Sequence, residues 1–303
     1  SFKVLSNISL SKNNFIPTFN NAMYFRIYTE IAYCNEFIRN TTDAMLSSNG
    51  ISGANLDEAK AMRAEAKFLR AQSYYHLLDM YGNVPFVDET TLGSLPQQIM
   101  RADLFNYVET QLKEAEAELK APRSNEYGRL DKAAAWSLLA RLYLNAKVYN
   151  GTERNADVIA NCEKVIGAGY SINPSFANLF LADNNINNPE NIFSIAYDGA
   201  RTQTNGGTTY LVCAAIGGSM KPADFGVSGG WGGLRTTKAF VNKFEATDKR
   251  GRFHTDGQTL EINDLGNFND GYAYIKYKNL TSAGAPGKDT GSVDTDPTLY
   301  RWD

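Results

Sequence analysis

The chain has 303 residues, of which 43% are hydrophobic and 12% aromatic, and this content excludes wholesale disorder. A net charge of −3 excludes the basic surface that is typical of nucleic-acid binding. The three cysteines are far apart and form no CxxC pair, which argues against a zinc site and against a disulfide framework. No apolar stretch reaches the length of a transmembrane helix.

The first half of the chain, from residue 22 to about 168, has the apolar spacing of helices. Asp57 is the predicted N-cap of the second helix, which Gly82 and Pro85 end, and Asp131 is the predicted N-cap of the fourth. We expect helices at residues 22–45, 58–80, 102–120, 132–148 and 152–166.

A short internal repeat links two of these helices. Leu69-x-Ala71-x-x-Tyr74 returns as Leu138-x-Ala140-x-x-Tyr143, about two tetratricopeptide periods of roughly 34 residues later. A small alanine lets paired helices approach closely, while the larger side chains fill the adjacent layer. The repeat therefore predicts stacked helical hairpins.

The second half is rich in loops. Residues 199–233 contain ten glycines and three charged residues. We expect a short strand at 208–213, a short helix at 236–245 and a strand at 272–277. Composition leaves open whether the glycine-rich stretch is a functional loop on a rigid scaffold or a mobile surface excursion.

Two motifs in this half match known sites only in part. Gly226-Val227-Ser228-Gly229-Gly230 fits GxSxG, but its flanks predict neither the strand nor the helix of a nucleophile elbow. The stretch 183–194 begins like a calcium loop and lacks both the glycine at its sixth position and the final glutamate, which excludes an EF-hand. We predict no cofactor and no catalytic residue, and a structural calcium ion bound in another way stays open.

Trp231 is the candidate ligand-binding aromatic. Two glycines precede it and two follow it, and glycines offer no side chains that would bury an indole. A ring held in such a loop is available to stack on the apolar face of a sugar. The alternative is an indole folded back onto the scaffold.

Three ordered segments resemble a known family. They are residues 65–87 (EAKFLRAQSYYHLLDMYGNVPFV), residues 128–144 (GRLDKAAAWSLLARLYL), and a third set formed by Tyr170, 176–180 and 190–193. Together they resemble the SusD/RagB proteins. Residues 205–213 and the Gly230-Trp231 pair are similar to the starch-binding branch of that family.

This resemblance implies a mostly α-helical fold, with tetratricopeptide-like hairpins, a loop-rich second half and a few short strands. It implies one SusD-like domain over residues 1–303, with a helical scaffold at 22–168 and a glycan-binding portion at 169–303. It also implies a non-catalytic lipoprotein at the surface of the outer membrane of Bacteroidetes. Such a protein binds an oligosaccharide or polysaccharide and delivers it to a SusC-like TonB-dependent transporter.

The resemblance also guides the choice of binding residues. Trp231 takes the place of one sugar-stacking aromatic of the branch, and Asn205 stands where a second aromatic, a tyrosine, is found. This departure favours a glycan other than starch. The remaining candidates are nearby polar residues that would bond to sugar hydroxyls: Arg201, Gln203, Thr208 and Arg235.

The family's proteins are longer and carry a lipid-anchored cysteine near the N-terminus, so we expect this chain to be part of a longer protein. Two other functions stay open. A glycoside hydrolase would need two carboxylates across a cleft, and no spacing among the acidic residues singles out a pair. A pure helical-repeat scaffold would bind a protein partner and no saccharide.

Overall fold

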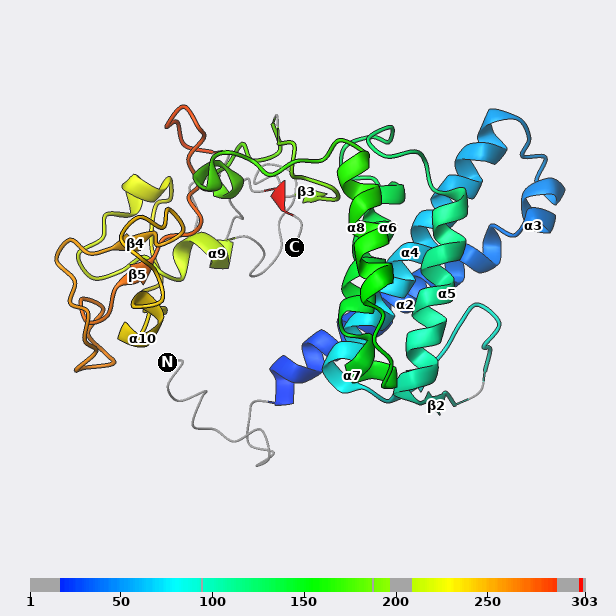
Figure 1. Ribbon diagram of the computed structural model, residues 1–303, viewed down its shortest axis with the longest axis horizontal. Coiled ribbons are helices and arrows are strands. Elements are labelled where there is room, and N and C mark those ends of the chain that lie inside the picture. The colour runs from blue at the N-terminus through cyan, green and yellow to red at the C-terminus, as the bar shows by residue number, and fades with distance from the viewer. Residues whose placement is uncertain (1–16, 94, 187, 197–208, 288–299, 302–303) are drawn as a thin grey trace. The chain divides into compact units, whose positions relative to one another are not determined.

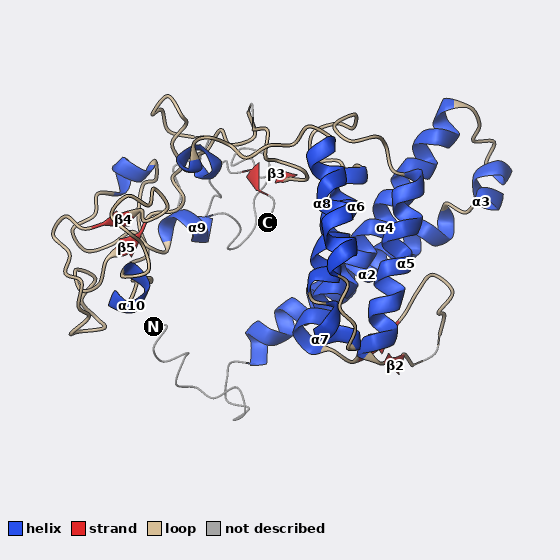
Figure 2. Ribbon diagram, in the orientation of Figure 1, coloured by secondary structure: helices blue, strands red, loops and turns tan. Residues whose placement is uncertain are grey.

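The computed structural model describes residues 17–93, 95–186, 188–196, 209–287 and 300–301. They form two compact units, and the boundary between the units lies between Tyr170 and Ser171. We call them the helical unit (17–170) and the loop-rich unit (the described residues from 171 on). Figure 2 shows helices dominating the first and loops the second. The expectation of a single domain over 1–303 stays a prediction.

Long helices and two short strands make up the helical unit. Strands β1 (Val84–Phe86) and β2 (Gln97–Ile99) pair antiparallel between the second and third long helices. The helices of its described part are α2 (Pro17–Asn40), α3 (Asp43–Ser48), α4 (Ala54–Tyr81), α5 (Arg101–Glu118), α6 (Lys132–Leu144), α7 (Ala146–Asn150) and α8 (Asn155–Gly167).

The long helices pack in chain order. Helix α2 contacts α4, α4 contacts α5, α5 contacts α6, and α6 contacts α8 (Figure 1). Small residues lie at these contacts, among them Ala64, Ala71 and Ala134, which are fully buried. Alanine allows helix axes to approach closely, so the next layer of larger side chains can interlock. The predicted arrangement of stacked helical hairpins is confirmed.

The repeated tyrosine performs a similar task in both copies of the motif. Tyr74 of α4 is fully buried, and its hydroxyl donates to the carbonyl oxygen of Val87 at 2.6 Å. Tyr143 of α6 is also buried, and its hydroxyl donates to Oε1 of Glu109 at 2.8 Å. Each ring fills the core, and each hydroxyl bonds to a neighbouring segment.

Helix boundaries agree with the sequence only in part. Asp131 is the N-cap of α6, as predicted, and its carboxylate accepts from the backbone N–H of Ala133 at 2.8 Å. The prediction of Asp57 as a cap is wrong, because α4 begins at Ala54 after Gly53 and Asp57 lies in its first turn. In the first turn, the negative charge of Asp57 stabilises the helix by interacting with the positive end of its dipole, and this needs no capping hydrogen bond.

Two expected helices are each divided. The helix expected at 22–45 ends at Asn40, and the hydroxyl of Thr42 then caps α3 by accepting from the N–H of Met45 at 3.3 Å. The helix expected to reach Val148 ends at Leu144, where Asn145 leaves the helical conformation and α7 follows. Thr42 forms such a break because its hydroxyl competes for a nearby backbone group, whereas Asn145 makes no side-chain capping bond.

The loop-rich unit contains only short elements. Its described elements are the 3-10 helices η1 (Phe176–Phe180) and η2 (Pro222–Phe225), the helices α9 (Thr209–Cys213) and α10 (Lys238–Val241), and the strands β3 (Ile195–Ala196), β4 (Phe253–His254), β5 (Ala273–Tyr274) and β6 (Tyr300–Arg301). Strand β3 pairs antiparallel with β6, and β4 with β5. The strand expected at 272–277 is thus two residues long, and the helix expected at 236–245 covers four.

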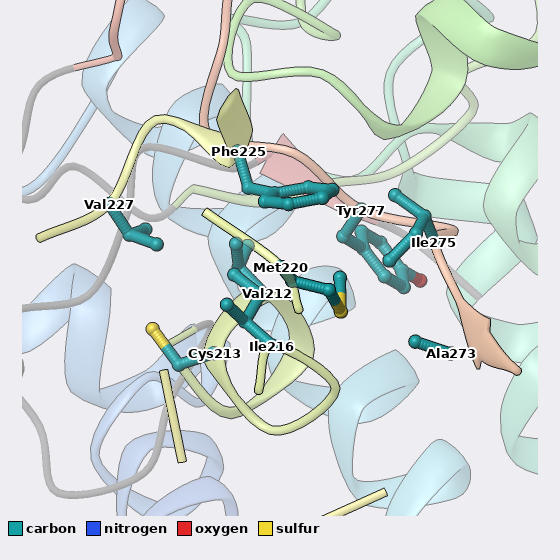
Figure 3. Close-up of a cluster of buried hydrophobic side chains, with 9 residues drawn as sticks. All are labelled: Val212, Cys213, Ile216, Met220, Phe225, Val227, Ala273, Ile275 and Tyr277. Carbon is teal, nitrogen blue, oxygen red and sulfur yellow. The ribbon is translucent and has the colours of Figure 1, made fainter. Parts of the chain in front are cut away.

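A cluster of buried apolar side chains holds these elements together (Figure 3). Part of the cluster comes from α9 and the loop after it, part from η2 and its exit, and part from the segment that contains β5. Its members are Val212, Cys213, Ile216, Met220, Phe225, Val227, Ala273, Ile275 and Tyr277. The cluster fixes the loops that carry the candidate site.

Candidate functional site

The segment that we expected to be a strand is helical. Thr209–Cys213 forms α9, and the N–H of Ala214 donates to the carbonyl of Tyr210 at 3.1 Å. Thr209, Val212 and Cys213 are buried at the spacing of one helix face, and Ile216 is buried just after the helix. Tyr210 projects from the other side, with 43% of its surface exposed. The apolar core, rather than the strand propensity of threonine, tyrosine and valine, decides this conformation.

The loop that carries Trp231 is bonded to the backbone that follows α9. The N–H of Trp231 donates to the carbonyl of Cys213 at 2.9 Å, and that of Gly232 to the carbonyl of Ile216 at 2.8 Å. The N–H groups of Gly233 and Leu234 both donate to the carbonyl of Ala214, at 2.9 and 3.0 Å. The described part of the glycine-rich stretch is therefore a packed loop.

Glycine is required where these two backbones meet. A Cβ on Gly217 would lie 2.7 Å from Cα of Gly232. Gly232 itself has φ +64°, which side-chain-bearing residues rarely adopt, and a Cβ there would lie 3.3 Å from the ring of Phe268. The glycines thus serve close packing, and they leave Trp231 as the one large side chain of residues 229–233.

Trp231 and Tyr210 form an exposed aromatic pair. Trp231 is 45% exposed, so the indole is not folded back into the core. The centroids of the two rings lie 6.1 Å apart, and their planes are inclined by 52°. Sequence reasoning missed Tyr210 because it assigned this segment to a strand. Reading 209, 212 and 213 as one helix face would have placed Tyr210 outside the core.

The guanidinium of Arg235 forms hydrogen bonds to backbone carbonyl groups of three segments. Its Nε donates to the carbonyl of Phe268 at 2.7 Å, and its Nη1 donates to the carbonyls of Ala215 at 2.8 Å and Leu234 at 2.7 Å. The guanidinium also lies over the ring of Phe268, 5.4 Å from its centroid. Burial lowers the pKa of Arg235. These bonds fix the loop after Trp231, and a sugar contact by Arg235 stays a prediction.

The other predicted site residues, Arg201, Gln203, Asn205 and Thr208, lie outside the described residues. Ser228, the serine of the GxSxG match, lies on an exposed loop after η2, so the strand and helix of a nucleophile elbow do not flank it. Asp183 binds Ser282, whose N–H and hydroxyl both donate to the carboxylate, the latter at 2.6 Å.

Within the described ranges, no group of three or more histidine, cysteine, aspartate or glutamate side chains is arranged to hold a metal ion. Asn187 of the calcium-like stretch is outside those ranges, so a calcium ion remains an open prediction. In the same part of the chain, every helix is too short or too polar to span a bilayer.

Comparisons with known proteins show which family the chain is similar to. Residues 5–144 match the SusD-like family described as starch-binding and associating with the outer membrane. The chain is 30% identical to the starch-binding protein SusD of Bacteroides thetaiotaomicron, over 92% of this chain and 57% of that protein. It is 25% identical to a SusD-like protein of Formosa agariphila, over 78% of this chain and 46% of that protein.

Solved structures share the fold. A SusD-like carbohydrate-binding protein of Bacteroides fragilis superposes with a TM-score of 0.67 at 20% identity, over 93% of this chain and 58% of that one. A laminarin-binding SusD-like protein gives the same TM-score at 17% identity, over 93% and 63%. The chain thus spans about half the length of the curated relatives that it matches. Taken with the three sequence segments and the helical hairpins, these matches show that residues 5–144 are similar to the SusD-like family and that the chain has the fold of SusD-like proteins.

Proposed function

We propose that this protein binds a glycan on the aromatic pair of Trp231 and Tyr210 and does no chemistry on it. The observation that carries the proposal is the exposure of both rings, Tyr210 on α9 and Trp231 on a loop that is otherwise packed and bonded. Exposed aromatic faces suit the apolar C–H surface of sugar rings. The inclination of 52° between the planes favours a glycan that turns along its length, because successive sugars stacked on the rings would be inclined in the same way.

The names of the relatives support the same class of ligand. One is called starch-binding and another laminarin-binding, and both names describe those proteins. For this chain we propose soluble starch and laminarin as the first two glycans to test. We further propose that the whole protein sits at the outer membrane and delivers its glycan to a SusC-like TonB-dependent transporter, as the family resemblance implies.

Native affinity electrophoresis tests the binding proposal. The wild-type chain would run through gels that contain starch, laminarin or an unrelated polysaccharide. We expect Trp231→Ala and Tyr210→Ala each to weaken retardation, by about tenfold in Kd for the indole. Tyr33→Ala is the matched control, because Tyr33 is an exposed aromatic of α2 in the other unit.

Assaying reducing ends in the same samples tests the absence of catalysis. Binding without new reducing ends supports a binding protein. New reducing ends that accumulate with time would show a glycoside hydrolase instead. Retardation that is equal in the wild type and in both aromatic variants would refute the assignment of this surface.

A further inference from the structure

A pocket of the loop-rich unit shares no residue with the aromatic pair. It encloses about 420 Å³, which is within the range of small-ligand pockets. Its wall is apolar on one part, formed by Phe225, Phe253 and Ile275, and charged on another. Phe225 and Ile275 also belong to the buried cluster, so part of this wall is fixed by the core of the unit.

Two cations line the pocket without a carboxylate partner. Among the described residues, neither Arg252 nor Lys278 has an acidic group within 4 Å, although both are half-buried. In the described part of the chain, the Arg252 guanidinium makes one hydrogen bond, in which Nη1 donates to the carbonyl of Lys276 at 3.3 Å. The ammonium of Lys278 lies over the ring of Phe225, 5.1 Å from its centroid. A half-buried guanidinium usually has more of its five donors paired.

The two charges are close enough to affect each other. Burial lowers the pKa of Lys278, the charge of Arg252 lowers it further, and Asp224 counteracts part of the effect. Asp224 also lines the pocket and is exposed, so one acid stands against two bases there. Arg250, next but one to Arg252, differs: it is paired with Asp248, with Nη2 and Oδ2 2.7 Å apart. The pocket therefore has a net positive charge that an anion would neutralise.

A further polar residue, besides Arg252, Lys278 and Asp224, lines the same pocket. His254 of β4 lines the pocket, and its Nε2 atom is buried and has no hydrogen-bond partner among the described residues. Buried polar atoms without a partner are uncommon in folded proteins. His254 is thus a polar residue of the pocket lining whose Nε2 the described residues leave without a partner.

We propose that this pocket binds a carboxylate or sulfate group carried on a sugar-sized ring. Arg252 and Lys278 hold the anionic group, and the aromatic wall contacts the apolar face of the ring. The guanidinium supplies paired donors suited to either anion, and the ammonium adds a point charge. The site is independent of the proposed glycan surface at Trp231.

An NMR titration of the whole chain tests this site with sodium glucuronate, glucose 6-sulfate, glucose and inorganic sulfate. We expect the two acidic sugars to bind in preference to glucose and to inorganic sulfate. Comparing glucuronate with glucose 6-sulfate tells which anionic group the pocket prefers. Lys278→Gln and Arg252→Gln should each weaken this binding by about tenfold, as the loss of a charged hydrogen bond predicts.

Three further variants keep the test specific. Asp224→Asn should tighten the binding, because it removes the one acid of the pocket. Arg250→Gln is the matched control, since it deletes an equal charge two positions away and outside the pocket. Trp231→Ala should leave the acidic sugar bound, which separates this site from the proposed glycan surface.

Two results would overturn the proposal. One is the failure of both acidic sugars to bind to a wild-type chain that is folded by circular dichroism. The other is binding that Lys278→Gln and Arg252→Gln leave unchanged. Inorganic sulfate that binds as tightly as the acidic sugars would overturn the role assigned to the aromatic wall.

Discussion

The two units are stabilised in different ways. In the helical unit, backbone groups are satisfied inside helices, and apolar side chains such as Phe68 and Leu112 fill the contacts between them. In the loop-rich unit, backbone groups of one loop bond to those of another, and side chains such as Arg235 and Asn279 bond to carbonyl oxygens. The difference teaches that the first unit depends mainly on packed volume, whereas the second depends on backbone geometry in addition to its own buried cluster.

The largest expected effect is the loss of packed volume in the helical unit. Phe68 of α4 is fully buried, so Phe68→Ala should lower the free energy of unfolding by about 3–5 kcal/mol. Phe240→Ala is the counterpart in the loop-rich unit. Its ring is 36% exposed beside Phe244 and Tyr274, so we expect less than half of that loss. Urea unfolding followed by circular dichroism measures both, and equal losses would erase the distinction.

Alkaline pH should also act mainly on the helical unit. Burial raises the pKa of Tyr74 to about 12, from an ordinary value of 10.0. The neutral phenol is favoured in the folded state, so its contribution is complete below pH 10 and is lost as the pH rises towards 12. The loss is on the order of 2 kcal/mol. Between pH 8 and pH 11, the free energy of unfolding should fall less for Tyr74→Phe than for the wild type. Equal decreases in the two proteins would contradict this.

Backbone geometry should matter most at Gly232. Its positive φ and the nearby ring of Phe268 predict that Gly232→Ala costs about 1–2 kcal/mol, with a further loss from displacement of the ring. Gly284→Ala is the matched control, since its φ is also positive, +81°, and no atom lies within 4 Å of the added Cβ. The difference between the two variants measures the close approach at the aromatic site. Equal melting temperatures would mean that backbone strain alone accounts for the effect.

The smallest expected effect is a difference in stability between two variants, one at the N-cap Asp131 and one at Asp57 in a first helical turn. Asp131 accepts from the N–H groups of Ala133 and Arg123, at 2.8 and 2.7 Å, so Asp131→Ala should cost about 1–2 kcal/mol. Asp57→Ala should cost about 0.3–1 kcal/mol, because it removes only a favourable charge near the start of α4. Thermal unfolding of the two variants at low salt provides the comparison. A larger loss at Asp57 would be incompatible with the N-terminus of α4 at Ala54.

Local signals in the sequence predicted much of the helical unit. Apolar spacing located the long helices, Gly82 marked the end of α4, and Asp131 marked the start of α6. The boundaries near Thr42 and Asn145 were missed, because a capping hydroxyl at Thr42 and a change of backbone conformation at Asn145 leave no signal in the apolar pattern. Helices are determined largely by neighbours in sequence, so they are the easier part to predict.

The loop-rich unit shows where such reasoning stops. The sequence by itself determined that Trp231 lies among glycines, and therefore that its indole would have few neighbours to bury it. Only the tertiary structure decided that the segment of Tyr210 is helical, and it brought Arg252 and Lys278 to the same pocket. These outcomes depend on contacts between residues distant in the chain. Their side chains gain free energy only when the buried cluster has brought the loops together, so no local pattern encodes the pocket, and the spacing around Tyr210 is only a weak sign of its helix.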